Sequence, residues 1–134
     1  MLAIVDTGPL YAAVDAGDAD HARCLEALET RGVRLIVPAM VVAEVTYLVG
    51  SRMGSKVEAD FLRGLAAMDV EAPRPEDFER MAELMKRHQA GGTDACIVAT
   101  AERLGTDLVI SLDVRRLGAL KPRHCPALRF LPAQ

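Results

Sequence analysis

Cysteine is scarce in this sequence, and long apolar runs are missing from it. The three cysteines, Cys24, Cys96 and Cys125, are odd in number and form no C-x-x-C pair. This pattern argues against a disulfide-built scaffold and a zinc knuckle, and it favours a reducing, cytoplasmic setting. A membrane span needs about 18 nearly uninterrupted apolar residues, whereas the best candidate, residues 38–49, is broken by Glu44. We therefore expect no membrane association.

The composition is that of a folded globular chain. Hydrophobic residues make up 51% and charged residues 26% of the 134 residues, which is enough to bury a core without disulfides or structural metal. The length predicts a single domain over residues 1–134. The net charge of −3 at first argues against a nucleic-acid binder, because such proteins are usually basic.

Short apolar runs alternate with helical patterns along the chain. One helical pattern places Phe78, Met81, Ala82 and Met85 at spacings i, i+3, i+4 and i+7. Runs of this kind between short buried strands indicate a parallel sheet covered on both faces. We therefore predict a three-layer α/β/α fold with a central parallel sheet of about five strands. The expected strands are Leu2–Asp6, Arg34–Val37, Met68–Glu71, Asp107–Ser111 and Leu128–Leu131.

Two aspartates follow expected strands. Asp6 closes the first strand, and Asp113 comes just after the strand that ends at Ser111. Active sites of open parallel sheets form beyond the carboxyl ends of the strands, so both side chains are expected at one edge. Either aspartate taken alone could equally be a turn former or a helix cap.

Two further carboxylates lie in apolar helical surroundings. Glu44 sits in AMVVAEVTYLV and shares a stripe with Met40, Val41, Tyr47 and Leu48. A carboxylate buried there must be paired, protonated or bound to a cation, and a salt bridge to an arginine is the simpler alternative. Asp94 follows Gly91-Gly92-Thr93 and shares a stripe with Ile97 and Val98, so it points inward unless it only favours the helix dipole.

Four converging carboxylates repel one another unless a cation lies between them. All the expected donors are oxygens, which favours Mg²⁺ or Mn²⁺ over zinc, and such ions act on phosphates. His21, His88 and His124 form no pair with useful spacing, so a mechanism that needs two imidazoles is disfavoured. Setting the four acids aside leaves 15 acidic against 16 basic residues, and a nucleic-acid substrate is then compatible with the charge.

Four segments together resemble the PIN domain family, and within it the small VapC-like toxins of type II toxin–antitoxin pairs. They are IVDTGPLYA, VPAMVVAEVTYLV, GGTDACIVATAERLGTDLV and ISLDVRRL. The resemblance implies a PIN-like fold and a metal-dependent endoribonuclease that cleaves RNA, with Asp6, Glu44, Asp94 and Asp113 as catalytic and metal-binding residues. It also implies a VapB-like antitoxin as partner and a homodimer.

The resemblance extends to residues around the acids. Thr7 and Ser111 match hydroxyl residues of the family, and with Arg115 and Arg116 they are expected to contact the substrate. One departure is that related toxins often carry an Asp and then a Phe where this chain has Arg116 and Leu117, which puts a second metal position in doubt. Arg52 and Arg103 are further candidates for the rim of the cleft.

The segment from Ala39 to Val49 is apolar nearly all round. A second stripe of Val42, Val45 and Val49 lies beside the one that holds Glu44. A helix of this kind is either fully buried or part of an interface, and we take the stripe as support for the homodimer.

Other readings of the acids fit less well. A haloacid-dehalogenase-type phosphatase needs a second Asp where this chain has Gly8, and a phosphorelay receiver domain wants paired acids where Asp6 is followed by Thr7. The remaining alternative is a catalytically silent PIN-like module that only binds RNA or a partner. Intact acids at all four positions argue against it.

Overall fold

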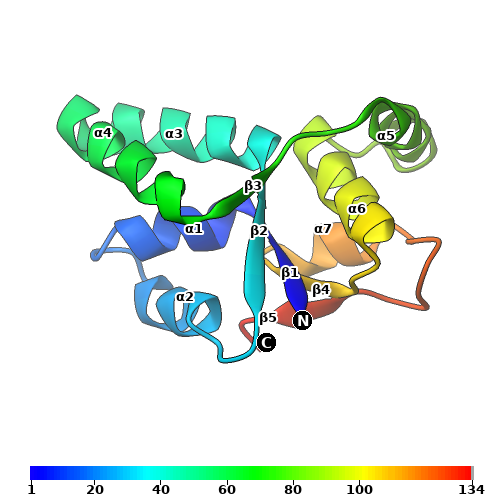
Figure 1. Ribbon diagram of the computed structural model, residues 1–134, viewed down its shortest axis with the longest axis horizontal. Coiled ribbons are helices and arrows are strands. Elements are labelled where there is room, and N and C mark those ends of the chain that lie inside the picture. Colours follow the sequence, from blue (N-terminus) through cyan, green and yellow to red (C-terminus); the bar gives the residue numbers. More distant parts are fainter. Residues whose placement is uncertain (134) are drawn as a thin grey trace.

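The computed structural model describes residues 1–133 and contains a five-stranded sheet whose neighbouring strands all pair in parallel (Figure 1). The strands are β1 (Leu2–Val5), β2 (Arg34–Pro38), β3 (Asp69–Glu71), β4 (Leu108–Ile110) and β5 (Arg129–Leu131). Their order in the sheet is β3-β2-β1-β4-β5, so β1 and β4 are neighbours at the centre. The predicted parallel sheet of about five strands is confirmed.

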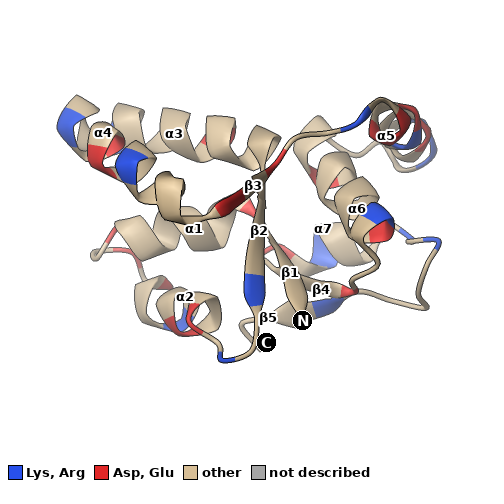
Figure 2. Ribbon diagram, in the orientation of Figure 1, with Lys and Arg blue, Asp and Glu red and all other residues tan. Residues whose placement is uncertain are grey.

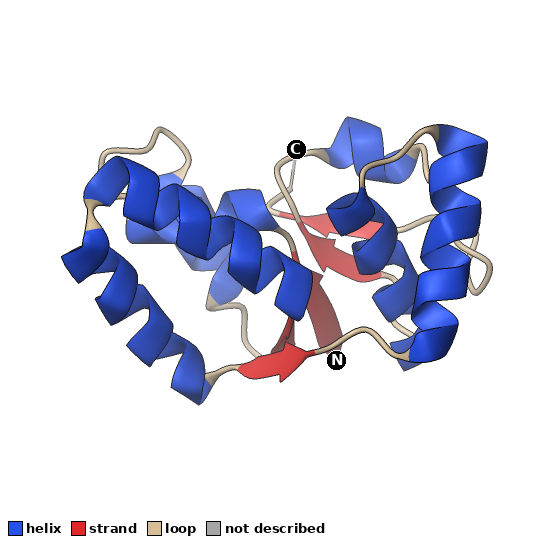
Figure 3. Ribbon diagram, turned by 90° about the horizontal axis from the view of Figure 1, so that it is seen from above, coloured by secondary structure: helices blue, strands red, loops and turns tan. Residues whose placement is uncertain are grey.

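Helices cover both faces of this sheet (Figures 1 and 3). On one side lie α1 (Thr7–Val14), α2 (His21–Leu28), α3 (Ala39–Met53) and α4 (Ser55–Gly64), the last continued by a short 3₁₀ helix over Leu65–Ala67. On the other side lie α5 (Pro75–His88), α6 (Gly92–Leu104) and α7 (Val114–Gly118). This is the predicted three-layer arrangement. No helix within residues 1–133 is long and apolar enough to cross a membrane.

The central strands are buried on both faces, as a sheet between two helical layers requires. Ala3, Ile4 and Val5 of β1 have no exposed surface, and neither do Val109 and Ile110 of β4. Burial of this apolar surface is the main favourable contribution to folding. The two strands therefore form a rigid base from which the residues that follow them extend.

Helix α3 does not present its valine stripe to a partner. Val45 and Val49 are fully buried in the core of the same chain, together with Val41, while Val42 is half-buried. The three buried valines are spaced i, i+4 and i+8, which places them on one helical face. The interpretation of the valine stripe as an interface is therefore wrong, and it lends the homodimer no support.

Helix α5 buries a different face from the one that its apolar spacing predicted. Met81 is buried as expected, but Phe78 is 56% exposed and Met85 is also exposed, whereas Asp77 and Leu84 are buried. The buried face includes Asp77 because its carboxylate accepts hydrogen bonds from Arg103 of α6 and from the backbone of Arg74. The spacing of apolar residues alone does not predict that Asp77 is buried.

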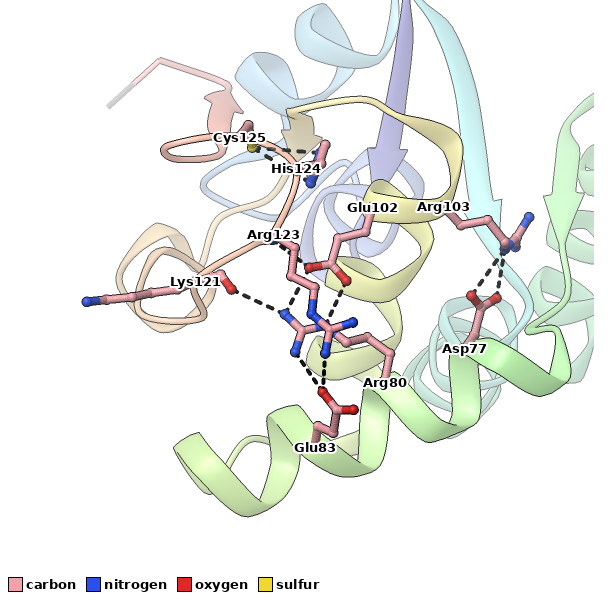
Figure 4. Close-up of polar contacts among 9 residues, drawn as sticks. All are labelled: Asp77, Arg80, Glu83, Glu102, Arg103, Lys121, Arg123, His124 and Cys125. Atoms are coloured by element: carbon pink, nitrogen blue, oxygen red, sulfur yellow. Dashed lines mark hydrogen bonds and ion pairs between the residues drawn. The ribbon is translucent and has the colours of Figure 1, made fainter.

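A network of ion pairs fastens α5 to α6 and to the segment after α7 (Figure 4). Arg80 donates to both carboxylate oxygens of Glu102, at 2.8 and 2.9 Å. The backbone amide of Arg123 donates to Glu102 Oε2 at 2.8 Å, and the Arg123 guanidinium contacts Glu83. Glu102 lies two turns along α6 from Asp94, so this network supports the helical layer rather than the acidic edge.

Candidate active site

The carboxyl ends of β1 and β4 open into a pocket of about 410 Å³. The structure brings all four expected carboxylates into its lining: Asp6, Glu44, Asp94 and Asp113. Asp6 and Asp113 follow the two central strands, Glu44 lies on α3, and Asp94 lies in the first turn of α6. The pocket lining contains no histidine or cysteine, so its charged donors toward a cation are oxygens.

Asp6 is held from two sides. It caps the N-terminus of α1, where its Oδ1 accepts a 2.7 Å hydrogen bond from the Thr7 amide. Its Oδ2 accepts a hydrogen bond of the same length from the hydroxyl of Ser111. Burial raises the pKa of Asp6; the two hydrogen bonds lower it in part, and the nearby Glu44 and Asp113 raise it further. This environment therefore disfavours the charged carboxylate unless a cation is close.

Ser111 links the two strand-end acids. Besides donating to Asp6, its hydroxyl accepts a 2.9 Å hydrogen bond from the backbone amide of Asp113. The side chain is completely buried, so it has no surface with which to touch a substrate. The expected substrate contact of Ser111 is wrong, because burial assigns this residue to positioning the two carboxylates.

Asp94 is buried at the start of α6 and faces the other acids. Burial raises its pKa, Arg116 lowers it, and Asp6, Asp113 and Glu44 raise it again. The inward orientation predicted from the stripe with Ile97 and Val98 is what the structure shows, since both of those side chains are fully buried as well.

Glu44 lines the pocket without being buried. Its side chain is exposed, and its Oε2 accepts a 2.8 Å hydrogen bond from the hydroxyl of Thr93. The expectation of a buried carboxylate was wrong because the valines define the inward face of α3. Glu44 shares the outer face with Tyr47, which is 72% exposed.

Thr93 is a site residue that sequence reasoning did not single out for this role. Gly91 is the N-cap residue of α6, and Thr93 lies within the first turn. Its partner Glu44 is 49 residues away. The only local signal was a hydroxyl directly before Asp94, which does not identify a contact with another helix.

Thr7 carries a hydroxyl that nothing in the described chain satisfies. The residue is 7% exposed, lines the pocket, and its Oγ1 is buried without a hydrogen-bond partner among residues 1–133. A buried hydroxyl left unpaired costs about 1–3 kcal/mol. The unpaired Thr7 hydroxyl beside Asp6 is therefore available to form a hydrogen bond with a ligand group in the pocket.

The four arginines proposed for the rim lie in different places. Arg116 lines the pocket, whereas the neighbouring Arg115 is exposed outside it. Figure 2 shows basic residues on α7. Arg103 is not at the rim: its ion pairs with Glu71 and Asp77 hold it at the far end of α6 (Figure 4). The Arg52 guanidinium stacks 4.9 Å from the centre of the Tyr11 ring and does not line the pocket.

The donor set fits a hard divalent cation. Carboxylate oxygens and an unpaired hydroxyl are the ligand types that Mg²⁺ and Mn²⁺ prefer. Within residues 1–133, however, no three His, Cys, Asp or Glu side chains are already gathered closely enough to hold a metal. Asp113 pairs with Arg116, and Glu44 accepts a hydrogen bond from Thr93. The chemical type of the donors fits such an ion.

Comparison with known proteins identifies the family of this chain. The PIN domain family matches residues 3–119 of the chain. Ribonuclease VapC26 of Mycobacterium tuberculosis is 36% identical over 124 residues, which cover 89% of this chain and 92% of that protein.

Solved structures share the fold. Mycobacterium tuberculosis VapC20, a sarcin-ricin loop cleaving toxin, superposes with a TM-score of 0.79 at 21% identity, covering 89% of this chain and 95% of that one. VapBC2 from Rickettsia felis, bound to a DNA fragment from its promoter, gives a TM-score of 0.72 at 15% identity, covering 97% of both chains. The chain therefore belongs to the PIN domain family, in its VapC-like branch.

Proposed function

We propose that this protein is a Mg²⁺- or Mn²⁺-dependent endoribonuclease and the toxin of a toxin–antitoxin pair. Its metal-binding and catalytic carboxylates are then Asp6, Glu44, Asp94 and Asp113. The observation that carries the proposal is the convergence of these four side chains on one pocket, in a chain 36% identical to a protein named ribonuclease VapC26. A silent binding module would have no need for four mutually repelling acids at one site.

In this proposal the metal ion and the side chains have separate roles. Asp6, Glu44, Asp94 and Asp113 would hold the divalent cation, which when bound would lower the pKa of a water molecule and offset charge on the phosphate. Ser111 fixes the orientation of Asp6, and Thr93 holds Glu44 beside the pocket. Thr7 contributes a free hydroxyl, and Arg116 a positive charge for the RNA backbone. In the proposed step a water oxygen forms the new bond to phosphorus, the bond from phosphorus to the 3′ oxygen breaks, and the released 3′ oxygen takes up a proton. The products would then carry 5′-phosphate and 3′-hydroxyl ends.

A VapB-like antitoxin is the proposed partner. One of the similar solved structures is a toxin–antitoxin complex from Klebsiella pneumoniae, with a TM-score of 0.72 at 19% identity, covering 88% of this chain and 92% of that one. This chain has an apolar groove of about 400 Å³ between α1, α2 and α4, lined by side chains that include Leu25, Leu28 and Phe61. An amphipathic helix fits such a groove. The homodimer remains part of the proposal on the family resemblance alone, and light scattering of the purified protein tests it.

The activity is tested with purified protein, structured RNA and a metal titration. We expect cleavage with Mg²⁺ or Mn²⁺, loss of cleavage on adding EDTA, and recovery when the ion is restored in excess. Asp6→Asn should be inactive, whereas Asp15→Asn, a matched change at the far end of α1, should cleave normally. RNA binding without cleavage under every metal condition would instead support the silent binding module.

A further inference from the structure

Arg116 places a positive charge among the pocket acids. It is the one Lys or Arg side chain, within the described residues 1–133, that lines the pocket. Its Nε donates to Asp113 Oδ2 at 2.6 Å and lies 3.5 Å from Asp94 Oδ2, while its Nη2 also contacts Asp113. The guanidinium therefore spans two carboxylates from different elements of the fold, since Asp94 lies in the first turn of α6 and Asp113 caps α7.

These contacts are made by a largely exposed side chain. The Arg116 side chain is 67% exposed. An arginine stem is long and flexible, and exposed ion pairs are weak, typically about 0–1 kcal/mol. The guanidinium can therefore leave Asp94 and Asp113 at small cost when a better partner for them arrives.

The two acids that Arg116 contacts belong to the proposed metal ligands. Arg116 and a divalent cation thus compete for the same oxygens, Asp94 Oδ2 and Asp113 Oδ2. A guanidinium released from carboxylates is well suited to phosphate, which it binds through two parallel hydrogen bonds. The exchange would leave the positive charge at the mouth of the pocket, where an RNA backbone enters.

We propose that Arg116 is an internal counter-ion that yields Asp94 and Asp113 to the divalent cation and then binds the phosphate of the RNA. This inference rests on the proposed metal-dependent ribonuclease function. It assigns one side chain two opposite effects, since Arg116 weakens ion binding in the free protein and strengthens RNA binding in the loaded one. A residue that only stabilised α7 would produce neither.

The first test measures Mn²⁺ binding without RNA by isothermal titration calorimetry. Arg116→Gln removes the competing charge, so its Kd for Mn²⁺ should fall about three- to tenfold below that of the unchanged protein. Arg116→Lys keeps the charge and should stay nearer the unchanged value. Arg115→Gln is the matched control, because Arg115 is exposed on the same helix outside the pocket, and its Kd should change less than twofold.

The second test measures RNA binding by fluorescence anisotropy with saturating Mn²⁺ in an Asp6→Asn background, which prevents cleavage and keeps three of the four carboxylates. Adding Arg116→Gln should weaken RNA binding by about fivefold or more, and adding Arg115→Gln should weaken it less. Circular dichroism verifies that every variant is folded.

The outcomes separate the two proposals. Unchanged or weaker Mn²⁺ binding by Arg116→Gln, with normal binding by the unchanged protein, overturns the counter-ion role and leaves the ribonuclease proposal standing. Unchanged RNA binding overturns the phosphate contact. If the unchanged protein binds no Mn²⁺, the metal-dependent function and the counter-ion role fall together.

Discussion

The hydroxyl of Ser111 donates a 2.7 Å hydrogen bond to Asp6 Oδ2 across 105 residues of sequence. The bond joins the ends of β4 and β1, and the same hydroxyl accepts from the Asp113 amide. A single buried group thus sets the geometry of two acids at the central edge of the sheet. Removing this hydroxyl should therefore lower both the stability of the protein and its activity.

We expect Ser111→Ala to lower the free energy of unfolding by about 1–3 kcal/mol, because Asp6 Oδ2 loses its buried donor. RNA cleavage should fall as well, since Asp6 is no longer held in position. Urea denaturation and a cleavage assay measure the two effects. Ser51→Ala is the control, because this exposed serine donates only to a carbonyl of its own helix and its loss should cost less than about 0.5 kcal/mol. Equal stability of the two variants would contradict the positioning role.

Asp6→Asn should abolish cleavage while leaving the metal-free protein at least as stable as before. The amide keeps nearly the size of the carboxylate but removes one of four repelling charges, and burial already disfavours the charged form of Asp6. Thermal unfolding in EDTA compares the two proteins. A loss of more than about 2 kcal/mol would show that Asp6 acts mainly as the cap of α1.

Thr7→Val tests the unpaired hydroxyl. Valine has almost the same shape and removes a buried polar group that has no partner, so the metal-free protein should be unchanged or stabilised by up to about 1 kcal/mol. Cleavage should nevertheless decrease, because the hydroxyl is proposed to serve the loaded site. Thr7→Ser should keep most of the activity. If Thr7→Val cleaves as well as the unchanged protein, the hydroxyl has no part in the reaction.

The Glu102 network makes stability depend on pH. Burial alone raises the pKa of Glu102, but hydrogen bonds from Arg80 and the Arg123 amide outweigh it and hold the pKa below the ordinary value of 4.5. A carboxyl group of this kind stabilises the fold above its unfolded pKa, and the contribution disappears as the pH falls through the folded pKa. Glu102→Gln should therefore destabilise the protein by about 1–2 kcal/mol at pH 7, with the difference shrinking below pH ~4.

Denaturation at several pH values measures this effect, with Glu79→Gln as the control on the exposed face of α5. A difference between Glu102→Gln and the unchanged protein that stays constant from pH 7 to pH ~3 would contradict the assignment.

The sequence predicted those features that depend on local pattern. Short buried runs indicated the parallel sheet, and the end of each central strand located Asp6 and Asp113. Features that depend on contacts between distant segments could not be predicted from the sequence. The apolar neighbours of Glu44 suggested burial, but the packing of the α3 valines decides which face turns inward. The hydrogen bond of Ser111 and the ion pairs of Arg116 likewise arise only when β1, α6 and α7 meet.

The most direct measurement of the central claim is the chemistry of the RNA ends after cleavage by the metal-loaded protein. Attack by water with the 3′ oxygen as the leaving group predicts 5′-phosphate and 3′-hydroxyl ends, which allow direct ligation to an adaptor, and cleavage that stops when EDTA removes the ion. Ends that carry a 2′,3′-cyclic phosphate, or cleavage that persists in EDTA, would show that the four carboxylates do not act as proposed.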